Sequence, residues 1–244
     1  MNKTVKRFAI ALLACAGLLR PGPAPAQLER YVSPSGSHEY PYTNWATAAT
    51  NLKVAVDAAN SNEVRDVVWV ADSRYILDET VVVSNAEVRG WSNIAREVIV
   101  DGGGNVRCFS LAHTNARLAG LTITNGYHAN ENGAGVYAGA SRVVISNCVI
   151  AANNAALGIC GGLYISNSYV QVQDTLITGN SGYGILVGGN YANFIGCTVS
   201  SNSSSGIIFG QVSCVISDCL LEGNGRHGAY QTSYGYLYVF NLKA

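Results

Sequence analysis

Short apolar alternations of three to five residues repeat along the second half of the chain, separated by glycine, asparagine and serine. Runs such as Val143 to Ile145 and Cys148 to Ile150 have the period of a strand, not that of a helix. Glycine followed by an apolar residue returns in steps of 27, 22, 22 and 22 residues, at Gly135, Gly162, Gly184, Gly206 and Gly228. Because a fixed period of this length is typical of stacked repeats, the pattern predicts a solenoid of short strands.

Three strands per repeat, each stacked on its equivalent in the next repeat, describe a parallel β-helix with equivalent residues about 4.8 Å apart. One inward ladder should contain Ile145, Val172, Phe194, Ile216 and Tyr238. A second should contain Ile150, Ile177, Val199 and Leu221. An asparagine recurs at one corner, at Asn153, Asn180, Asn202 and Asn224. Amide side chains can hydrogen-bond from rung to rung there, and we place the glycine ladder at another corner.

Three segments carry a resemblance to a known family: Ile-Ser-Asn-Cys-Val-Ile-Ala-Ala-Asn at 145–153, Gly-Gly-Leu-Tyr-Ile at 161–165, and Ile-Ser-Asp-Cys-Leu-Leu-Glu-Gly-Asn at 216–224. They resemble right-handed parallel β-helix repeats of the pectate-lyase-like superfamily, and also the repeats of polymorphic outer-membrane proteins and bacterial surface adhesins. The resemblance covers the chain from about Asp66 onward and implies an all-β solenoid. It leaves activity open, because this superfamily mixes polysaccharide lyases, glycosidases and non-catalytic surface proteins.

The first 26 residues have the parts of a secretory signal peptide. A basic start is followed by an apolar stretch from Phe8 to Leu19, too short to span a bilayer, and by Ala24-Pro25-Ala26 as a cleavage site. A lipoprotein signal ending at Cys15 is the less favoured alternative. We therefore expect a secreted or cell-surface protein, on the outer surface or in the periplasm of a bacterium.

Residues 27–65 lie outside the repeat and are expected to cap the solenoid of residues 66–244. An amphipathic helix is predicted from Asn44 to Ala59, with Leu52 and Val56 on its apolar face and Thr43 or Asn44 as its cap. Early strands are predicted at Val67 to Val70, Thr80 to Val83, and Val98 to Asp101.

Charge narrows the set of partners. Loss of the leader would remove four of the 15 basic residues, leaving eleven against 15 acidic ones. Nucleic acid is not an expected partner, because phosphate neutralisation needs a basic stripe. No second long apolar stretch is present, so no transmembrane segment is expected in the mature chain.

Six cysteines follow the leader, and three of them, Cys148, Cys197 and Cys219, occupy one row of the repeat with Thr175. This favours a stack of buried thiols over a disulfide framework, since stacked side chains point the same way. Metal-ligand spacing of the Cys-x₂-Cys kind is absent, and no metal or other cofactor is expected, apart from Ca²⁺ if the chain is a lyase.

Charged residues are sparse after residue 108, which limits catalysis. Asp174 and Asp218 recur at one offset, which would place their carboxylates about 10 Å apart across two rungs. That separation lies at or just beyond the upper end used by inverting glycosidases, and Arg142 is the accompanying base. Carboxylates that cap turns at a corner are the favoured interpretation. His128 and Glu131, in one predicted loop, are interpreted as solvated.

One row of outward-facing residues carries tyrosines at both ends and aliphatic residues between them. The middle residues of the glycine-started strands should point away from the core, giving Tyr137, Tyr164, Leu186, Ile208 and Tyr230. Such a stripe would be about 19 Å long. Exposed aromatic side chains suit sugar rings or a partner surface, so Tyr137, Tyr164 and Tyr230 are the candidate ligand-binding residues. Stacking that only stabilises the sheet is the other interpretation.

These patterns favour an exported protein that binds a glycan or a protein partner at the surface without catalysis. The alternatives are a polysaccharide lyase or glycoside hydrolase using Asp174, Asp218 and Arg142, and a truncated fragment of a longer surface protein. The repeat fails near the end, where Tyr234 to Leu242 alternate as one extended strand. An uncovered last rung predicts end-to-end self-association through this segment.

Overall fold

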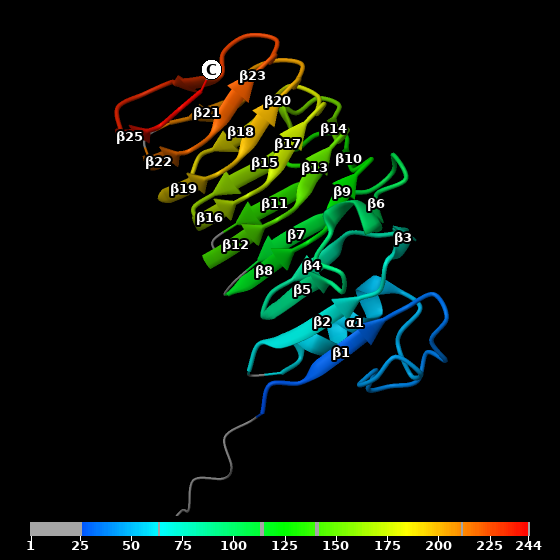
Figure 1. The fold of residues 1–244 in the computed structure, drawn as a ribbon. Coiled ribbons are helices and arrows are strands. Elements are labelled where there is room, and N and C mark those ends of the chain that lie inside the picture. Colours follow the sequence, from blue (N-terminus) through cyan, green and yellow to red (C-terminus); the bar gives the residue numbers. More distant parts are fainter. Residues whose placement is uncertain (1–25, 63, 113–114, 140–141, 211, 244) are drawn as a thin grey trace, which may run out of the picture.

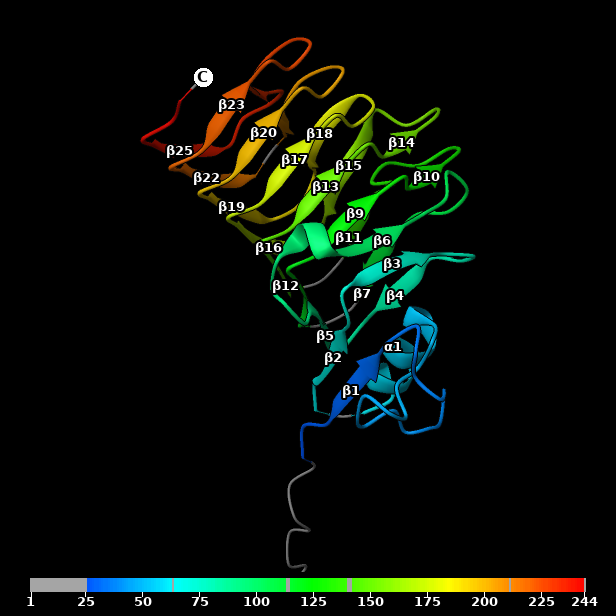
Figure 2. The ribbon, with the colours of Figure 1, turned by 45° about the vertical axis from the view of Figure 1, so that its right-hand side comes forward.

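The computed structural model describes residues 26–62, 64–112, 115–139, 142–210 and 212–243. The predicted signal peptide and Cys15 lie outside these residues, apart from Ala26. The chain winds into a parallel β-helix with three sheets, as predicted (Figure 1; Figure 2). We call the three sheets A, B and C, and their strands are given below. Each full turn passes from sheet C to sheet A and then to sheet B.

Sheet A has nine parallel strands: β1 (Glu29–Val32), β2 (Asp66–Val70), β5 (Ala86–Gly90), β8 (Ala116–Ala119), β12 (Arg142–Ser146), β16 (Tyr169–Gln173), β19 (Tyr191–Ile195), β22 (Ser213–Ser217) and β25 (Tyr236–Phe240). Sheet B has seven: β3 (Ser73–Ile76), β6 (Val98–Asp101), β9 (Thr122–Thr124), β13 (Val149–Ala151), β17 (Leu176–Thr178), β20 (Thr198–Ser200) and β23 (Leu220–Glu222). Sheet C also has seven: β4 (Val81–Val83), β7 (Phe109–Ala112), β11 (Val136–Gly139), β15 (Cys160–Ser166), β18 (Tyr183–Val187), β21 (Ile207–Phe209) and β24 (Ala229–Gln231). The three early strands predicted from the sequence are β2, β4 and β6.

The inward ladder of sheet A is confirmed over four of its five predicted positions. Ile145 lies opposite Val172, which is followed by Phe194 and Ile216, and all four are fully buried. The prediction for Tyr238 was wrong. Val239 lies opposite Ile216, while Tyr238 pairs with Val215 and is 52% exposed. The last turn is one residue longer than the 22-residue step, and a shift of one residue turns a strand's side chains to the other face.

The asparagine ladder is a continuous chain of amides, buried at Asn153, Asn180 and Asn202 and half-buried at Asn224. Nδ2 of Asn153 donates to Oδ1 of Asn180 at 3.0 Å, and the same bond joins Asn180 to Asn202 and Asn202 to Asn224. Each accepting oxygen also takes the backbone N–H of the preceding asparagine, at 3.0 to 3.1 Å. The second Nδ2 proton goes to a strand carbonyl, for example that of Ile150. Every ladder amide therefore has one required orientation.

The glycine ladder lies against these amides and not at a separate corner, so that part of the prediction was wrong. A Cβ at Gly184 would lie 2.6 Å from Nδ2 of Asn202, and one at Gly135 would lie 2.7 Å from Nδ2 of Asn153. Both contacts are closer than side chains tolerate. Glycine is therefore required because the amide of the ladder occupies the space of its side chain.

The described cysteines are all buried and free. In the predicted row, Sγ of Cys148 donates to the carbonyl of Ser146 at 3.2 Å, and Oγ1 of Thr175 donates to the carbonyl of Gln173 at 2.7 Å. A hydroxyl and a thiol thus meet the same need, which explains why threonine stands in this row. Burial raises the pKa of the Cys148 thiol to about 12.

The N-terminal segment joins sheet A directly, since β1 pairs with β2. The predicted helix forms over a shorter span, α1 (Leu52–Asn60), capped by Asn51, and its Leu52, Val56 and Ala59 are buried as expected. The predicted start at Asn44 was wrong. The residues before α1 return to β1 instead. The N–H of Ala49 donates to the carbonyl of Tyr31 in β1, and its carbonyl accepts from the N–H of Ser33 directly after β1, both at 2.9 Å. In the described part of the chain, no helix is long and apolar enough to cross a membrane.

The last strand of sheet A is β25, with Tyr236 71% and Phe240 56% exposed. After it, Lys243 pairs with the chain at β23, donating to the carbonyl of Cys219 at 2.9 Å and accepting from the N–H of Leu221 at 2.8 Å.

The N–H of Tyr236 donates to the carbonyl of Val212 at 3.1 Å, and the carbonyl of Phe240 accepts from the N–H of Asp218 at 3.0 Å; these two partners flank β22. In a parallel pair, alternate residues direct both backbone groups to the same neighbour, so Leu237 and Val239 direct theirs away from β22. This is the edge that self-association would use.

We expect Asn180→Ala to lower the free energy of unfolding by about 2–4 kcal/mol, because it leaves both N–H groups of Asn153 without their acceptor. Urea unfolding measures the change. Asn190→Ala is the control, since Asn190 is exposed and its loss should cost less than about 0.5 kcal/mol. Equal effects of the two substitutions would contradict a structural role for the ladder.

The buried thiols should make the protein less stable at alkaline pH. The pKa of a thiol in an unfolded chain is about 8.5, whereas burial raises the pKa of Cys148 in the folded chain to about 12. The contribution of the protonated Cys148 thiol to the free energy of unfolding is therefore complete below about pH 8.5, and it falls as the pH rises from about 8.5 toward 12. Urea midpoints at pH 7 to 10, under reducing conditions, should fall less steeply for Cys148→Val than for the parent. Thr175→Val, which removes no ionisable group from the same row, should keep the parent's slope, and an unchanged slope for Cys148→Val would refute the assignment.

Self-association through residues 234–242 remains a prediction, and sedimentation over a range of concentrations tests it. Val239→Pro removes a backbone donor from the open edge and none from the ladder with β22, so it should shift the protein toward monomer. A parent that stays monomeric at all concentrations would show that this edge does not pair.

Candidate functional site

The outward row of sheet C is in register as predicted. Tyr137 lies opposite Tyr164, and the row continues through Leu186, Ile208 and Tyr230. Its members differ in exposure, since Ile208 is only 5% exposed and Tyr230 is 49% exposed. The row is therefore not one continuous aromatic face. It has a tyrosine pair at one end and a separate tyrosine at the other.

The tyrosine pair forms a platform along the sheet. The rings of Tyr137 and Tyr164 have centroids 5.7 Å apart and planes inclined by 39°. Glycine lies under both rings. A Cβ at Gly139 would be 2.6 Å from Oη of Tyr137, and one at Gly188 would be 3.7 Å from Oη of Tyr164. The absence of a side chain at Gly139 lets the ring of Tyr137 lie over the strand.

Arg107 fixes the position of the Tyr137 ring. Its guanidinium carbon lies 5.1 Å from the ring centroid, the geometry of a cation–π contact. Its nitrogens donate to the carbonyls of Gly133 and Asn132 at 3.0 and 3.1 Å and to Glu131 at 2.8 Å. Arg107 is 8% exposed, so these acceptors replace water around the charge.

A ridge of inserted residues flanks the platform. The strands β10 (Tyr127–His128) and β14 (Asn154–Ala155) pair with each other outside the three main sheets. The chain after β10 carries Glu131, whose carboxylate accepts from Arg107 and lies 3.5 Å from Nε2 of His128. The hydrogen bond from Arg107 is the main cause that lowers the pKa of Glu131. The loop predicted to be merely solvated thus holds Arg107 under Tyr137.

Platform and ridge enclose a hollow of about 410 Å³, lined by Asn130, Glu131, Asn132, Tyr137, Tyr164 and Ser166. It offers aromatic faces, amides and a hydroxyl, the groups that stack on and hydrogen-bond to a polyhydroxylated ring. Glu131 is the one carboxylate lining it in the described part of the chain, and Arg107 already neutralises it. Among the described residues, no second carboxylate lines the hollow, so it does not contain the carboxylate pair that glycoside hydrolysis commonly uses.

Tyr230 lies apart from this hollow, and its ring stacks on His227 with centroids 5.0 Å apart. Two rungs, at Leu186 and Ile208, separate it from Tyr164. A ligand that contacts all three tyrosines would have to span the full row.

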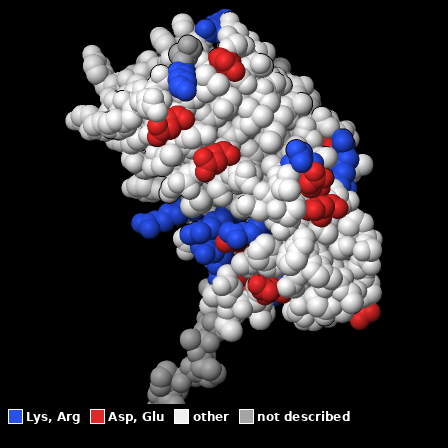
Figure 3. All heavy atoms as spheres, viewed as in Figure 1, with Lys and Arg blue, Asp and Glu red and all other residues white. Residues whose placement is uncertain are grey.

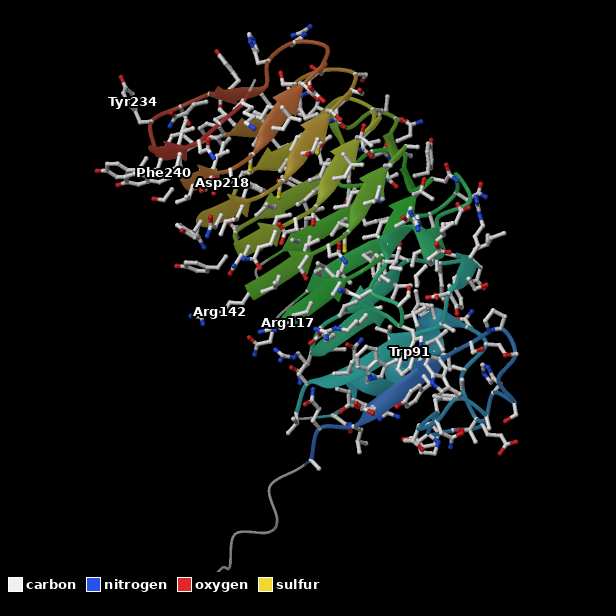
Figure 4. The ribbon with its side chains drawn as sticks, in the orientation of Figure 1. Trp91, Arg117, Arg142, Asp218, Tyr234 and Phe240 are labelled. Carbon is white, nitrogen blue, oxygen red and sulfur yellow. The ribbon has the colours of Figure 1, made fainter. Side chains whose placement is uncertain are left out.

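The candidate catalytic residues lie at opposite ends of the strands of sheet A: Arg142 at the start of a strand, and Asp174 and Asp218 just after the end of theirs. Asp174 and Asp218 stand at the corner after β16 and β22 and have positive φ, 47° and 55°. This left-handed corner is shared down the helix, by Asn147, Gly196 and Asn241. Asp218 accepts 2.7 Å hydrogen bonds from Ser217 and Asn241, which lower its pKa in that order. Arg142 begins β12, five strand residues from the corner, or roughly 16 Å. The structure does not bring it to the carboxylates, as Figure 4 shows for Arg142 and Asp218.

Sequence reasoning missed Arg107. The position of Arg107 beside Gly133 follows only from the pairing of β7 with β11. In this pairing Phe109 lies opposite Val136, and the N–H of Cys108 donates to the carbonyl of Ala134. In the described residues, no group of three His, Cys, Asp or Glu side chains is placed to hold a metal ion. Calcium remains tied to the lyase alternative.

The chain belongs to the family of right-handed β-helix regions, whose model matches residues 60–241. This agrees with the register of the three sheets and the asparagine ladder. A search of curated proteins found no match.

Several solved structures share the fold. A pectin methylesterase in complex with hexasaccharide VII is 11% identical, with a TM-score of 0.56 over 86% of this chain and 90% of its own. The pectin methylesterase PemA from Erwinia chrysanthemi is 11% identical, with a TM-score of 0.54 over 87% and 82%. The enzyme from Aspergillus niger is 11% identical, with a TM-score of 0.52 over 90% and 86%. At this identity the likeness concerns the fold alone.

Proposed function

We propose that this chain is an exported β-helix protein that binds a glycan on the outer face of sheet C, between the tyrosine platform and the β10–β14 ridge. The observation that carries the proposal is the ring pair of Tyr137 and Tyr164, in which the ring of Tyr137 lies close to Gly139 and against the guanidinium of Arg107. The fold, which is shared with a pectin methylesterase in complex with a hexasaccharide, is consistent with a carbohydrate-related role.

The side chains around the platform favour binding over a purely structural role. Stacking that only stabilised the sheet would not require Arg107 to be built in beneath one ring. Arg107 makes three hydrogen bonds and the cation–π contact, so the ring of Tyr137 is held in place before a ligand arrives. Preorganised aromatic groups lose little conformational entropy on binding, which favours capture of a flexible chain.

Tyr137→Ala combined with Tyr164→Ala should weaken glycan capture by about tenfold or more, since each aromatic contact contributes about 0.5–1.5 kcal/mol. Both side chains face outward, so the fold should survive, which circular dichroism checks. Retention of the mature protein on neutral and acidic polysaccharides is the measurement. Tyr40→Ala is the matched control, because Tyr40 is 70% exposed and belongs to the N-terminal segment, outside both the platform and residues 234–242.

Unchanged capture by the double variant would refute the proposal. The parent could instead capture a protein partner and no polysaccharide, with that capture lost in the same double variant. This result would support the binding surface but would change the proposed ligand from a glycan to a protein. Tyr230→Ala, tested alongside, shows whether the ligand extends along the full row.

The enzymatic alternative rests on the fold shared with pectin methylesterases and on Asp174, Asp218 and Arg142. Its test is product release from the same polysaccharides. Asp174→Asn should abolish release if this residue is catalytic, and should leave capture unchanged if it only forms the left-handed corner.

A further inference from the structure

Four arginines from successive turns gather on the outer face of sheet A. Arg89 lies in β5, Arg117 in β8 and Arg142 at the start of β12, while Arg65 directly precedes β2. Figure 3 shows the basic patch over this part of the molecule, and Figure 4 shows Arg117 and Arg142 at the same end of their strands. Strand register explains the gathering, since Arg117 pairs with Val144 and Arg142 stands two residues before it.

Most of this positive charge is unpaired. Arg89 forms an ion pair with Glu87, the one acidic residue on the outer face of these strands. Arg65, Arg117 and Arg142 have no carboxylate oxygen within 4.0 Å in the described part of the chain. No two of these arginines are directly opposite one another in the sheet, and Arg117 lies opposite Glu87.

Three buried polar atoms lack a hydrogen-bond partner: Nε of Arg65 and Oδ1 of Asn193, whose side chains line one groove, and Nε of Arg89, which lies outside the groove. They are the only such side-chain atoms in the described part of the chain. The guanidinium of Arg89 packs on Trp69, with its carbon 5.5 Å from the ring centroid. Because almost all buried polar groups in proteins are partnered, the atoms of Arg65 and Asn193 are unusual, and both belong to side chains that line the same groove.

The next rungs add aromatic and amide groups. Tyr169 lies opposite Arg142 and is 55% exposed, and Tyr191 follows it on the same row. The adjacent row carries Gln171 and Asn193. Together with Arg65, Arg117 and Arg142 these side chains line a groove of about 320 Å³. The groove therefore changes along the solenoid axis from cationic to aromatic and amide.

We propose that this groove is a second binding site, separate from sheet C, that takes a glycan chain bearing carboxylate or sulfate groups. The planar guanidinium matches both kinds of oxyanion in a two-pronged hydrogen bond. Equivalent side chains recur about every 4.8 Å along the axis, which suits a repeating polymer laid along the sheet. Its acidic groups contact the arginines, and its rings lie on Tyr169 and Tyr191.

The extent of the patch favours a glycan over nucleic acid. No lysine or arginine occurs in β16, β19 or β22, so the basic surface ends where the tyrosines begin. A nucleic acid needs a positive track that follows its evenly spaced phosphates. A polymer whose charges are fewer and whose rings carry hydroxyl groups matches the combination of arginine, tyrosine, glutamine and asparagine.

Arg117→Gln combined with Arg142→Gln tests the proposal. Both side chains are exposed, so the fold should be retained. The mature protein is titrated with polygalacturonate, with dextran sulfate and with unmodified dextran at several salt concentrations. We expect the parent to bind at least one acidic polymer more tightly than dextran, with affinity that falls as salt rises, and the variant to bind it at least about tenfold more weakly. The two acidic polymers distinguish a carboxylate from a sulfate ligand.

The control combines Arg96→Gln with Arg226→Gln, which changes the net charge equally at exposed residues outside the groove. It should bind like the parent. An equal loss in the control would overturn the proposal in favour of non-specific charge attraction. The Tyr137→Ala, Tyr164→Ala variant, tested in parallel, should keep its affinity for the acidic polymer. If it alone loses affinity, the site belongs to sheet C. A parent that binds no acidic polysaccharide, or that binds a single-stranded oligonucleotide more tightly, would also overturn the assignment.

Discussion

Each asparagine of the ladder holds two successive turns of the chain at a fixed offset, and the rest of the solenoid depends on that register. The amide of Asn180 accepts from both N–H groups of Asn153 and donates to Asn202 and to the carbonyl of Ile150. A slip of one residue would break these bonds and turn every strand of the rung over. The ladder therefore determines which side chains reach the core and which form the outer faces.

Function-bearing features occur where the turns depart from the shortest repeat. The hydrogen bonds from Asn180 to Asn202 and from Asn202 to Asn224 span 22 residues, whereas that from Asn153 to Asn180 spans 27. Extra residues at the asparagine corner build the ridge of β10 and β14 beside the tyrosine platform. From β8 onward the corner between sheets A and B carries no such insertion, because two residues, the first with positive φ, close each turn there. Asp174 and Asp218 occupy this corner.

The regular turns could be predicted from the sequence because identical offsets imply identical environments. The strands, the asparagine row, the thiol row and the outward tyrosines follow from this alone. Tyr238 was misplaced because the last turn adds one residue, which no local pattern near β25 signals. The helix start was misplaced because pairing with β1 outweighs helix propensity near Ala49. The arginine groove could not be found from the sequence. Glu87 pairs with Val67 on one side and with Arg117 on the other, so the step changes from 20 to 30 residues within two turns.

The two outer faces show different solutions to placing charge on a solenoid that has few charged residues. On sheet C, Arg107 is enclosed by three acceptors, so its charge serves to hold an aromatic ring. On sheet A, Arg117 and Arg142 have no carboxylate oxygen within 4.0 Å among the described residues, and the buried Nε of Arg65 has no acceptor. In a repeat protein each turn contacts only its neighbours, so such a local cost is borne by two or three turns and not by the whole fold. The asparagine ladder, which runs from Asn153 to Asn224, stabilises the turns of β16 and β19 from within. The interior can thus support an outer surface whose unpaired groups are available to a ligand.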